Sequence, residues 1–235
     1  MTKTTDNIAY YQAPGPRNQD VVRISKLAPE ITVACIVDGW NSKDLGTDEP
    51  GRQFATRVAE RFPKIFLSYK INNPQKKAKI ATEAMDKEML AKYPRDVSCV
   101  GSFLFLLPGQ DILVTIGSVF VLVWNGKLWY RPKEIGDYSL SPQKFPSDVS
   151  RFIGRGELKN DPFYSATPDV IASPTGKKIF IASDGLEDLF TVAEFNQWAE
   201  NQLVGKPKLF VNHLFAEIQR RQFRQKDDVS ILLKS

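Results

Sequence analysis

Short apolar runs with an aspartate at one end are the clearest pattern in this chain. Four runs of strand length share it: residues 21–24 after Asp20, 32–37 before Asp38, 178–183 before Asp184 and 229–233 after Asp227. If these strands lie antiparallel in neighbouring positions, the end of one lies beside the start of the next. The pattern therefore predicts that the four carboxylates meet at one end of the structure.

The remaining apolar pattern alternates between helical and strand-like segments. Helical spacing predicts helices over about residues 50–67 and from 75 towards 93, where Pro94 ends the second one. The spacing then changes to strands at 100–107, 112–115, 119–124 and 128–130, and Asn125-Gly126 is a hairpin signal. Residues 136–174 are rich in proline and glycine, which predicts an irregular surface segment. Helices are expected near 186–190, 192–202 and 207–222.

Strands grouped together and helices in pairs favour an α+β fold with mainly antiparallel sheets over strict strand–helix alternation. We predict a four-layer αββα sandwich, in which two sheets are each covered by a helix pair. No linker-like or low-complexity tract divides the chain, so we expect a flexible N-terminus over residues 1–12 and a single domain over 13–235.

Composition narrows the class of protein. The 235 residues are 42% hydrophobic and 25% charged, which is typical of a globular protein with a sizeable core. The N-terminus lacks a secretory signal pattern, and no apolar run is long enough to span a bilayer, so we expect a cytoplasmic protein. Cys35 and Cys99 lie in strand-like runs, where small buried residues are expected rather than a disulfide.

The net charge of +5 is modest, and many of the basic residues lie towards the C-terminus. Residues 208–222 carry apolar side chains at helical spacing, so their basic residues are most simply the solvated face of an amphipathic helix, with His213 on its surface or flank. Binding of nucleic acid is therefore not expected.

A cluster of aspartates calls for a cation, because like charges held close together raise one another's pKa values unless a divalent ion neutralises them. Oxygen ligands favour Mg²⁺ or Mn²⁺, whereas zinc favours Cys and His ligands. A single aspartate beside a strand is more often a turn residue. The arrangement of apolar strand, Asp and Gly nevertheless occurs twice, at Asp38-Gly39 and at Asp184-Gly185.

Eight short motifs, in order along most of the chain, resemble those of the metal-dependent Ser/Thr protein phosphatases of the type 2C family. They are Asn18-Gln19-Asp20, Val37-Asp38-Gly39, Gly101-Ser102, residues 113–117 with 125–128 after them, residues 150–154, residues 167–170, residues 183–186 and residues 227–230. Each motif alone is weak, and their order makes the resemblance specific.

This resemblance implies an αββα sandwich with two Mn²⁺ or Mg²⁺ ions between the sheets. By similarity, Asp38 would bridge the two metals, the Gly39 carbonyl would ligate one, and Asp184 and Asp227 would hold the other. Asp20 would bind nearby, directly or through water. The catalytic set is thus Asp38, Asp184 and Asp227, while Asp228 is expected to be a turn residue or to lie behind the metal ligands.

The chain departs from the family pattern at Ser118, at Gly15 and at residues 40–43, which stand where bacterial members often continue the Asp-Gly motif into a glycine-rich turn. Ser118 stands where the family usually has an aspartate that helps to hold a third metal, and a neutral hydroxyl is a poorer ligand for a hard cation. Gly15 stands where bacterial members commonly have a phosphate-binding arginine. Arg17 either binds the phosphate from a shifted loop or is a solvated loop charge.

The leading functional hypothesis is hydrolysis of phosphoserine or phosphothreonine on a protein substrate, opposing a Ser/Thr kinase in signalling. The alternative is a catalytically weak relative that acts as a phosphoprotein-binding or regulatory scaffold, because of Ser118 and Gly15. We expect a monomer without a membrane partner. The substrate and the preference between Mn²⁺ and Mg²⁺ are not encoded in any motif of the chain.

Overall fold

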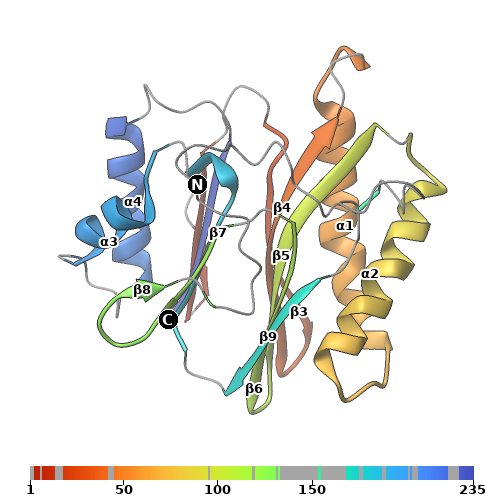
Figure 1. Ribbon diagram of the computed structural model, residues 1–235, viewed down its shortest axis with the longest axis horizontal. Coiled ribbons are helices and arrows are strands. Elements are labelled where there is room, and N and C mark those ends of the chain that lie inside the picture. The colour runs from red at the N-terminus through yellow and green to blue at the C-terminus, as the bar shows by residue number, and fades with distance from the viewer. Residues whose placement is uncertain are drawn as a thin grey trace.

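Two antiparallel sheets face each other in the structure, and a pair of helices covers the outer side of each (Figure 1). The computed structural model describes residues 3–5, 7–13, 18–41, 45–94, 96–117, 120–130, 132, 153–154, 168–174, 177–186, 189–200, 202, 206–221 and 228–235. The order of layers is helix, sheet, sheet, helix, which confirms the predicted α+β fold with four layers.

The first sheet has five strands in the order β3-β4-β5-β6-β9, and all its neighbours are antiparallel. Its strands are β3 (Val21–Ala28), β4 (Ile31–Asn41), β5 (Val97–Leu107), β6 (Gln110–Ile116) and β9 (Asp169–Pro174). Helices α1 (Glu49–Ser68) and α2 (Pro74–Leu90) cover its outer face.

The second sheet has six strands in the order β1-β2-β11-β10-β7-β8. Its strands are β1 (Lys3–Thr5), β2 (Ile8–Ala13), β7 (Phe120–Trp124), β8 (Trp129–Tyr130), β10 (Ile179–Ala182) and β11 (Val229–Lys234). Helices α3 (Val192–Ala199) and α4 (Pro207–Arg221) cover it, and a short 3-10 helix, η2 (Asp184–Leu186), follows β10.

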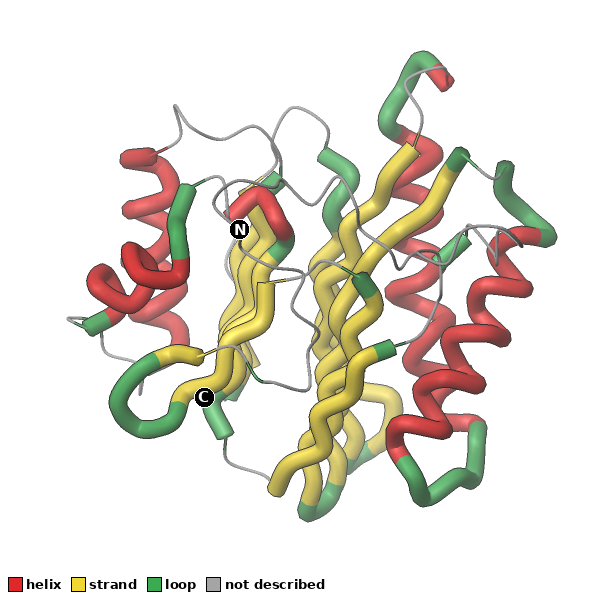
Figure 2. The backbone as a smooth tube through the Cα atoms, in the orientation of Figure 1, coloured by secondary structure: helices red, strands yellow, loops and turns green. Residues whose placement is uncertain are grey.

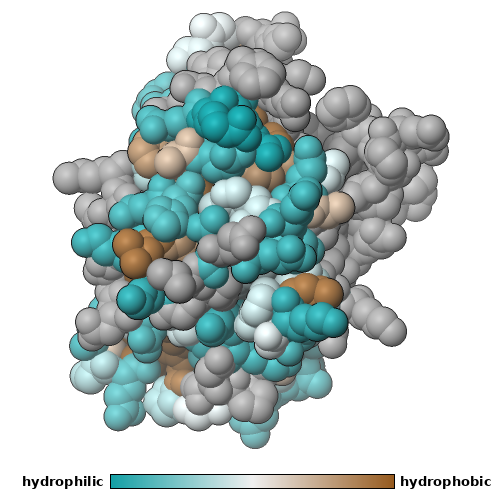
Figure 3. All heavy atoms as spheres, turned by 90° about the vertical axis from the view of Figure 1, so that its left-hand side faces the viewer, coloured by the Kyte–Doolittle hydropathy of each residue, from teal (hydrophilic) through white to brown (hydrophobic). Residues whose placement is uncertain are grey.

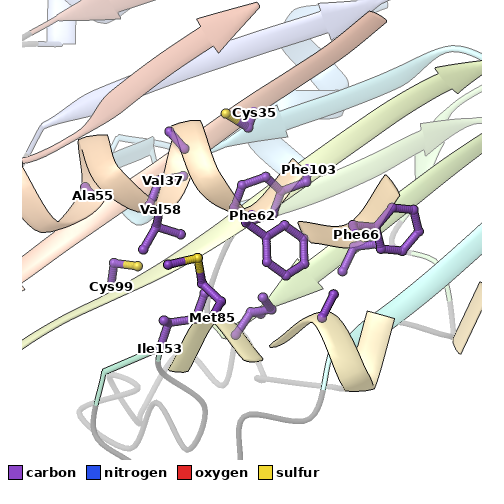
Figure 4. Packing of buried hydrophobic residues seen from close by; sticks show 14 of the residues in the cluster. Cys35, Val37, Ala55, Val58, Phe62, Phe66, Met85, Cys99, Phe103 and Ile153 are labelled. Atoms are coloured by element: carbon purple, nitrogen blue, oxygen red, sulfur yellow. The ribbon is translucent and has the colours of Figure 1, made fainter. Parts of the chain in front are cut away.

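Alternation along the strands divides the interior into three apolar layers. In β4, Val33, Cys35 and Val37 point towards α1 and α2, while Ala34 and Ile36 point towards the second sheet. Figure 4 shows the outer layer, where Phe62 and Phe66 of α1 lie against the aromatic residues of β5. Both cysteines are buried and free, as predicted.

Three sequence predictions about elements were wrong or incomplete. Residues 8–12, expected in a flexible N-terminus, belong to β2, because Ile8 and Tyr11 fill the core beside β11. The end of the segment expected to be irregular, 136–174, contains strand β9, which completes the edge of the first sheet. Most of that segment lies outside the described residues. Only η2 is described where a helix over 186–190 was expected.

The α3–α4 face is mainly hydrophilic, and its hydrophobic residues form separate small patches (Figure 3). This agrees with the predicted amphipathic helix, in which Phe210, Leu214 and Ile218 are buried and His213 is exposed. The imidazole Nδ1 of His213 lies 2.7 Å from Oε1 of Gln202, consistent with the predicted surface position. No helix in the described part of the chain is long and apolar enough to cross a membrane.

Candidate metal centre

The register of β3 and β4 brings two of the predicted aspartates together. Val21 pairs with Val37, so the next position outward places Asp20 opposite Asp38. Both positions have the same parity as Val22 and Ile36, which pack between the sheets, so both carboxylates lie on the inner face of the first sheet.

Strands β10 and β11 bring further polar residues to the same end from the second sheet. Pairing of Ala182 with Ile231 continues into a hydrogen bond from the Ser183 backbone N–H to the Ser230 carbonyl, at 2.9 Å. The Ser183 hydroxyl accepts a hydrogen bond from the Ser230 backbone N–H at 2.9 Å and donates one to the Asp228 carbonyl at 3.2 Å. These bonds fix the segment from which Asp184 emerges.

Asp228 fastens the loop before β3 to the start of β11. It is 1% exposed, and its carboxylate accepts hydrogen bonds from three successive backbone N–H groups. These donors are Asn18 at 2.9 Å, Gln19 at 2.5 Å and Asp20 at 3.1 Å. The bonds cross from one sheet to the other, so Asp228 positions Asp20 rather than acting as a simple turn residue.

Asp20 is a buried carboxyl with a strongly perturbed pKa. Asp20 is 1% exposed, and its Oδ2 has no hydrogen-bond partner among the described residues. Burial raises the pKa of Asp20 to about 7. The charges of Asp228 and Asp184 act in the same direction, while the nearby hydroxyls of Ser183 and Ser230 act to lower it. A bound cation would neutralise this charge and satisfy the orphaned oxygen.

Asp38 of β4 also acts electrostatically on Cys99 of the neighbouring strand β5. Its charge contributes to a pKa of Cys99 well above the usual value, after burial of the thiol and together with Asp86 of α2. Beyond the last residue of β6, Ile153 takes the next position beside β5, and its backbone N–H donates to the Cys99 carbonyl at 2.9 Å. Gly154 donates its N–H to Asp86 Oδ1 at 2.6 Å.

Helix α1 approaches Gly39, within strand β4 and next to Asp38, so closely that a side chain does not fit there. A Cβ on Gly39 would lie 2.3 Å from the carbonyl oxygen of Gly51 in α1. The Asn41 side chain fixes this approach, because its Oδ1 accepts from the Gly51 N–H at 3.1 Å and from Gln19 Nε2 at 2.6 Å. The loop before β3, strand β4 and α1 are thus linked around Asp38.

The structure accounts for part of the predicted site. Asp20, Asp38, Gly39 and Asp184 lie at one end of the sandwich. Arg17, Asp227, Gly15 and Ser118 lie outside the described residues. No group of three or more His, Cys, Asp or Glu side chains that could hold a metal ion is assembled within the described part of the chain.

Sequence reasoning did not assign roles to Ser183, Ser230, Gln19 or Asn41, and it placed Asp228 only as a turn residue or one behind the metal ligands. A signal for Asp228 and Ser230 is present at the start of β11, where the two polar residues stand on either side of Val229, Asp228 just before the strand and Ser230 within it. Such positions share one face, here the face between the sheets.

Comparison with solved structures gives many matches, and the three described here cover nearly the whole chain. Stp1, a serine/threonine phosphatase from Staphylococcus aureus, has a TM-score of 0.68 and 13% identity, with 100% of this chain and 97% of that one covered. MsPP, a PPM Ser-Thr phosphatase from Mycobacterium smegmatis, has a TM-score of 0.67 and 15% identity, with 99% of both chains covered.

A third match is the catalytic domain of the serine threonine protein phosphatase PstP, solved with two manganese ions. It has a TM-score of 0.65 and 11% identity, and the alignment covers 96% of both chains. No known family matches the sequence itself, and no curated protein matches it. The chain therefore has the fold of PPM-type Ser/Thr phosphatases, as the motifs predicted.

Proposed function

We propose that this protein hydrolyses phosphoserine and phosphothreonine on protein substrates with the help of two Mn²⁺ or Mg²⁺ ions. The observation that supports this most is the buried Asp20 carboxylate, whose pKa is raised to about 7 and whose Oδ2 has no partner among the described residues. It lies opposite Asp38 in a fold shared with solved phosphatases.

The residues that would hold the metals come from both sheets. In this proposal the groups that would hold the two ions are the carboxylates of Asp38, Asp184 and Asp227 and the carbonyl of Gly39. Asp20 lies nearby as a direct or water-mediated ligand. The ions would supply the Lewis acidity that activates a water and neutralises the phosphoryl oxygens.

The protein's own contribution is positioning and charge. Asp228 and Ser183 hold the two strand ends in place before any substrate binds, which is what catalysis of phosphoryl transfer requires. Arg17 is the candidate phosphate ligand, since a guanidinium fork matches the phosphate oxygens. We further propose a cytoplasmic monomer that opposes a Ser/Thr kinase.

The test is hydrolysis of a phosphothreonine peptide in the presence of chelator, Mg²⁺ or Mn²⁺. Asp38→Asn and Asp184→Asn should each lower kcat at least about a hundredfold, because each removes a charged metal ligand. Asp96→Asn, at an exposed position, is the matched control and should keep full activity. Activity that persists in chelator, or in both site variants, would contradict the proposal.

A catalytically weak, phosphoprotein-binding relative is the second candidate, because Ser118 and Gly15 replace residues that the family uses for a third metal and for phosphate. If wild type binds metal and phosphopeptide but hydrolyses slowly, Ser118→Asp should raise kcat. An unchanged rate in that variant would exclude Ser118 as the cause.

A further inference from the structure

A cluster of lysines surrounds the turn between α1 and α2. Between residues 61 and 82 the chain has no aspartate or glutamate, although it carries many basic residues. We call the basic residues at this end of the helix pair the lysine cluster: Lys64, Lys70, Lys76, Lys77 and Lys79. Three of them are contributed by the first six residues of α2.

The lysines at the start of α2, Lys76 and Lys77, do not stabilise that helix. Asn73 caps α2, with its side chain accepting from the Lys76 N–H at 2.9 Å, so Lys76 lies in the first turn. That end of a helix carries a partial positive charge and favours acidic side chains, yet the first turn of α2 contains none. The positions of Lys76 and Lys77 therefore work against the stability of α2.

Ion pairing among the described residues does not account for the cluster either. At the opposite end of α2, Glu88 pairs with Arg57, Arg61 and Lys92 at 2.9–3.2 Å. In the cluster, the only described ion pair is Lys79 with Glu83, which are 4.0 Å apart and largely exposed.

The other members of the cluster differ in their surroundings. Lys77 lies over the Phe66 ring, 4.7 Å from its centroid. Lys64, Lys70 and Lys76 are exposed and have no ion pair among the described residues. Positive charge is thus available to a partner at the α1–α2 turn.

The surroundings of the cluster restrict the kind of partner. The large hydrophobic residues that are exposed in the described part of the chain are Leu128, Tyr130 and Leu209, all on the other sheet and its helices. The lysine cluster therefore offers no apolar side chain for insertion into a membrane. Tyr69, the aromatic residue of the turn, packs against the core, so it is not presented as a stacking platform for a base.

The distance between the lysine cluster and the proposed metal centre sets the minimum length of a peptide that could reach both. Gly51 of α1 lies against Gly39, and Lys64 is further along the same helix, about 20 Å away at 1.5 Å per residue. Figure 2 shows the turn between α1 and α2 at the far end of this helix. An extended peptide needs about six residues to span that length.

We propose that the lysine cluster docks an acidic segment of the phosphoprotein substrate, separated from the phosphorylated residue by about six residues or more. The inference rests on the proposed function for the identity of the partner. Binding of the acidic segment itself requires neither metal nor hydrolysis, and charged contacts of this kind mainly accelerate association and select partners.

The experiment compares wild type with Lys64→Gln/Lys70→Gln/Lys76→Gln. The substrate is a phosphothreonine peptide with a flexible spacer of about eight residues and a tail of about six glutamates. The triple variant should raise KM roughly tenfold at low salt and leave kcat unchanged. A peptide with a Gly/Ser tail should have the same KM for both proteins.

Lys127→Gln/Lys206→Gln/Lys208→Gln is the matched control, because it removes the same charge from exposed positions on the other half of the molecule. It should behave as wild type. Fluorescence anisotropy of a labelled, unphosphorylated glutamate peptide gives a readout without catalysis, and its binding should weaken in the first variant alone.

The outcomes separate the two proposals. Binding of the glutamate peptide that depends on the cluster, without any hydrolysis, would support docking and contradict the phosphatase activity. Hydrolysis with the same KM in all three proteins would support the activity and overturn docking. Tighter cluster-dependent binding of a single-stranded oligonucleotide of equal charge would overturn the choice of an acidic polypeptide.

Discussion

At the scale of single residues, Asp20 shows how one buried carboxyl links stability to the metal. The pKa of Asp20 is raised from 3.8 to about 7 by burial, with smaller contributions from Asp228 and Asp184. Because the folded pKa lies above the unfolded one, the protonated carboxyl stabilises the metal-free protein fully below about pH 4, and this stabilisation is lost as the pH rises through about 7.

We therefore predict that the free energy of unfolding of the chelated protein falls between about pH 4 and pH 7, by on the order of a few kcal/mol. Asp20→Asn should remove most of this fall, because the amide does not ionise. Urea unfolding at a series of pH values measures both. Parallel pH curves for the two proteins would contradict the assignment.

At the scale of elements, the contact between α1 and β4 depends on a missing side chain. A Cβ on Gly39 would lie 2.3 Å from the Gly51 carbonyl oxygen and 3.2 Å from Ala55 Cβ, both in α1. Backbone atoms cannot rotate away as a side chain can, so the helix would have to move off the strand that carries Asp38.

Gly39→Ala should lower the free energy of unfolding by about 3 kcal/mol or more, and urea unfolding curves measure this loss. Gly46→Ala is the comparison, because no atom lies within 4 Å of its Cβ and only its φ of +69° opposes the substitution. That variant should lose about 1–2 kcal/mol. Equal losses in the two variants would show that the helix adapts to the extra methyl group.

At the scale of the whole molecule, one buried ion pair joins the two sheets at the end remote from Asp38. Lys234 Nζ of β11 lies 2.7 Å from Asp111 Oδ2 of β6 and donates to the Lys177 carbonyl at 2.7 Å. The two residues are 5% and 2% exposed, so neither charge is screened well by water.

Asp111→Asn should cost about 3–5 kcal/mol in the free energy of unfolding, because it leaves the Lys234 charge buried without its counter-ion. The double variant Asp111→Leu/Lys234→Met should recover most of that loss. Glu60→Gln, which breaks the exposed pair with Arg23, is the control and should cost less than about 1 kcal/mol. A small loss in Asp111→Asn would indicate that water reaches Lys234.

Some strands could be predicted from the sequence and others could not. Strand runs ending at Asp38 and Asp184 were readable because each alternates or is continuously apolar over the length of a strand. Strand β2 was missed because Tyr10, Tyr11 and Gln12 give it no clear alternation, although Ile8 and Ala9 are buried. Strand β9 was missed because prolines surround it, and an edge strand tolerates them.

Sequence by itself determined the class of fold and which aspartates to consider, because side-chain periodicity and turn residues act locally. Tertiary structure decided which of these aspartates lie close together and which hydrogen bonds hold them in place. Asp228 reaches the loop before β3, more than 200 positions earlier in the chain, only because β11 lies beside β2. The raised pKa of Asp20 likewise depends on burial between two sheets, which no local pattern specifies.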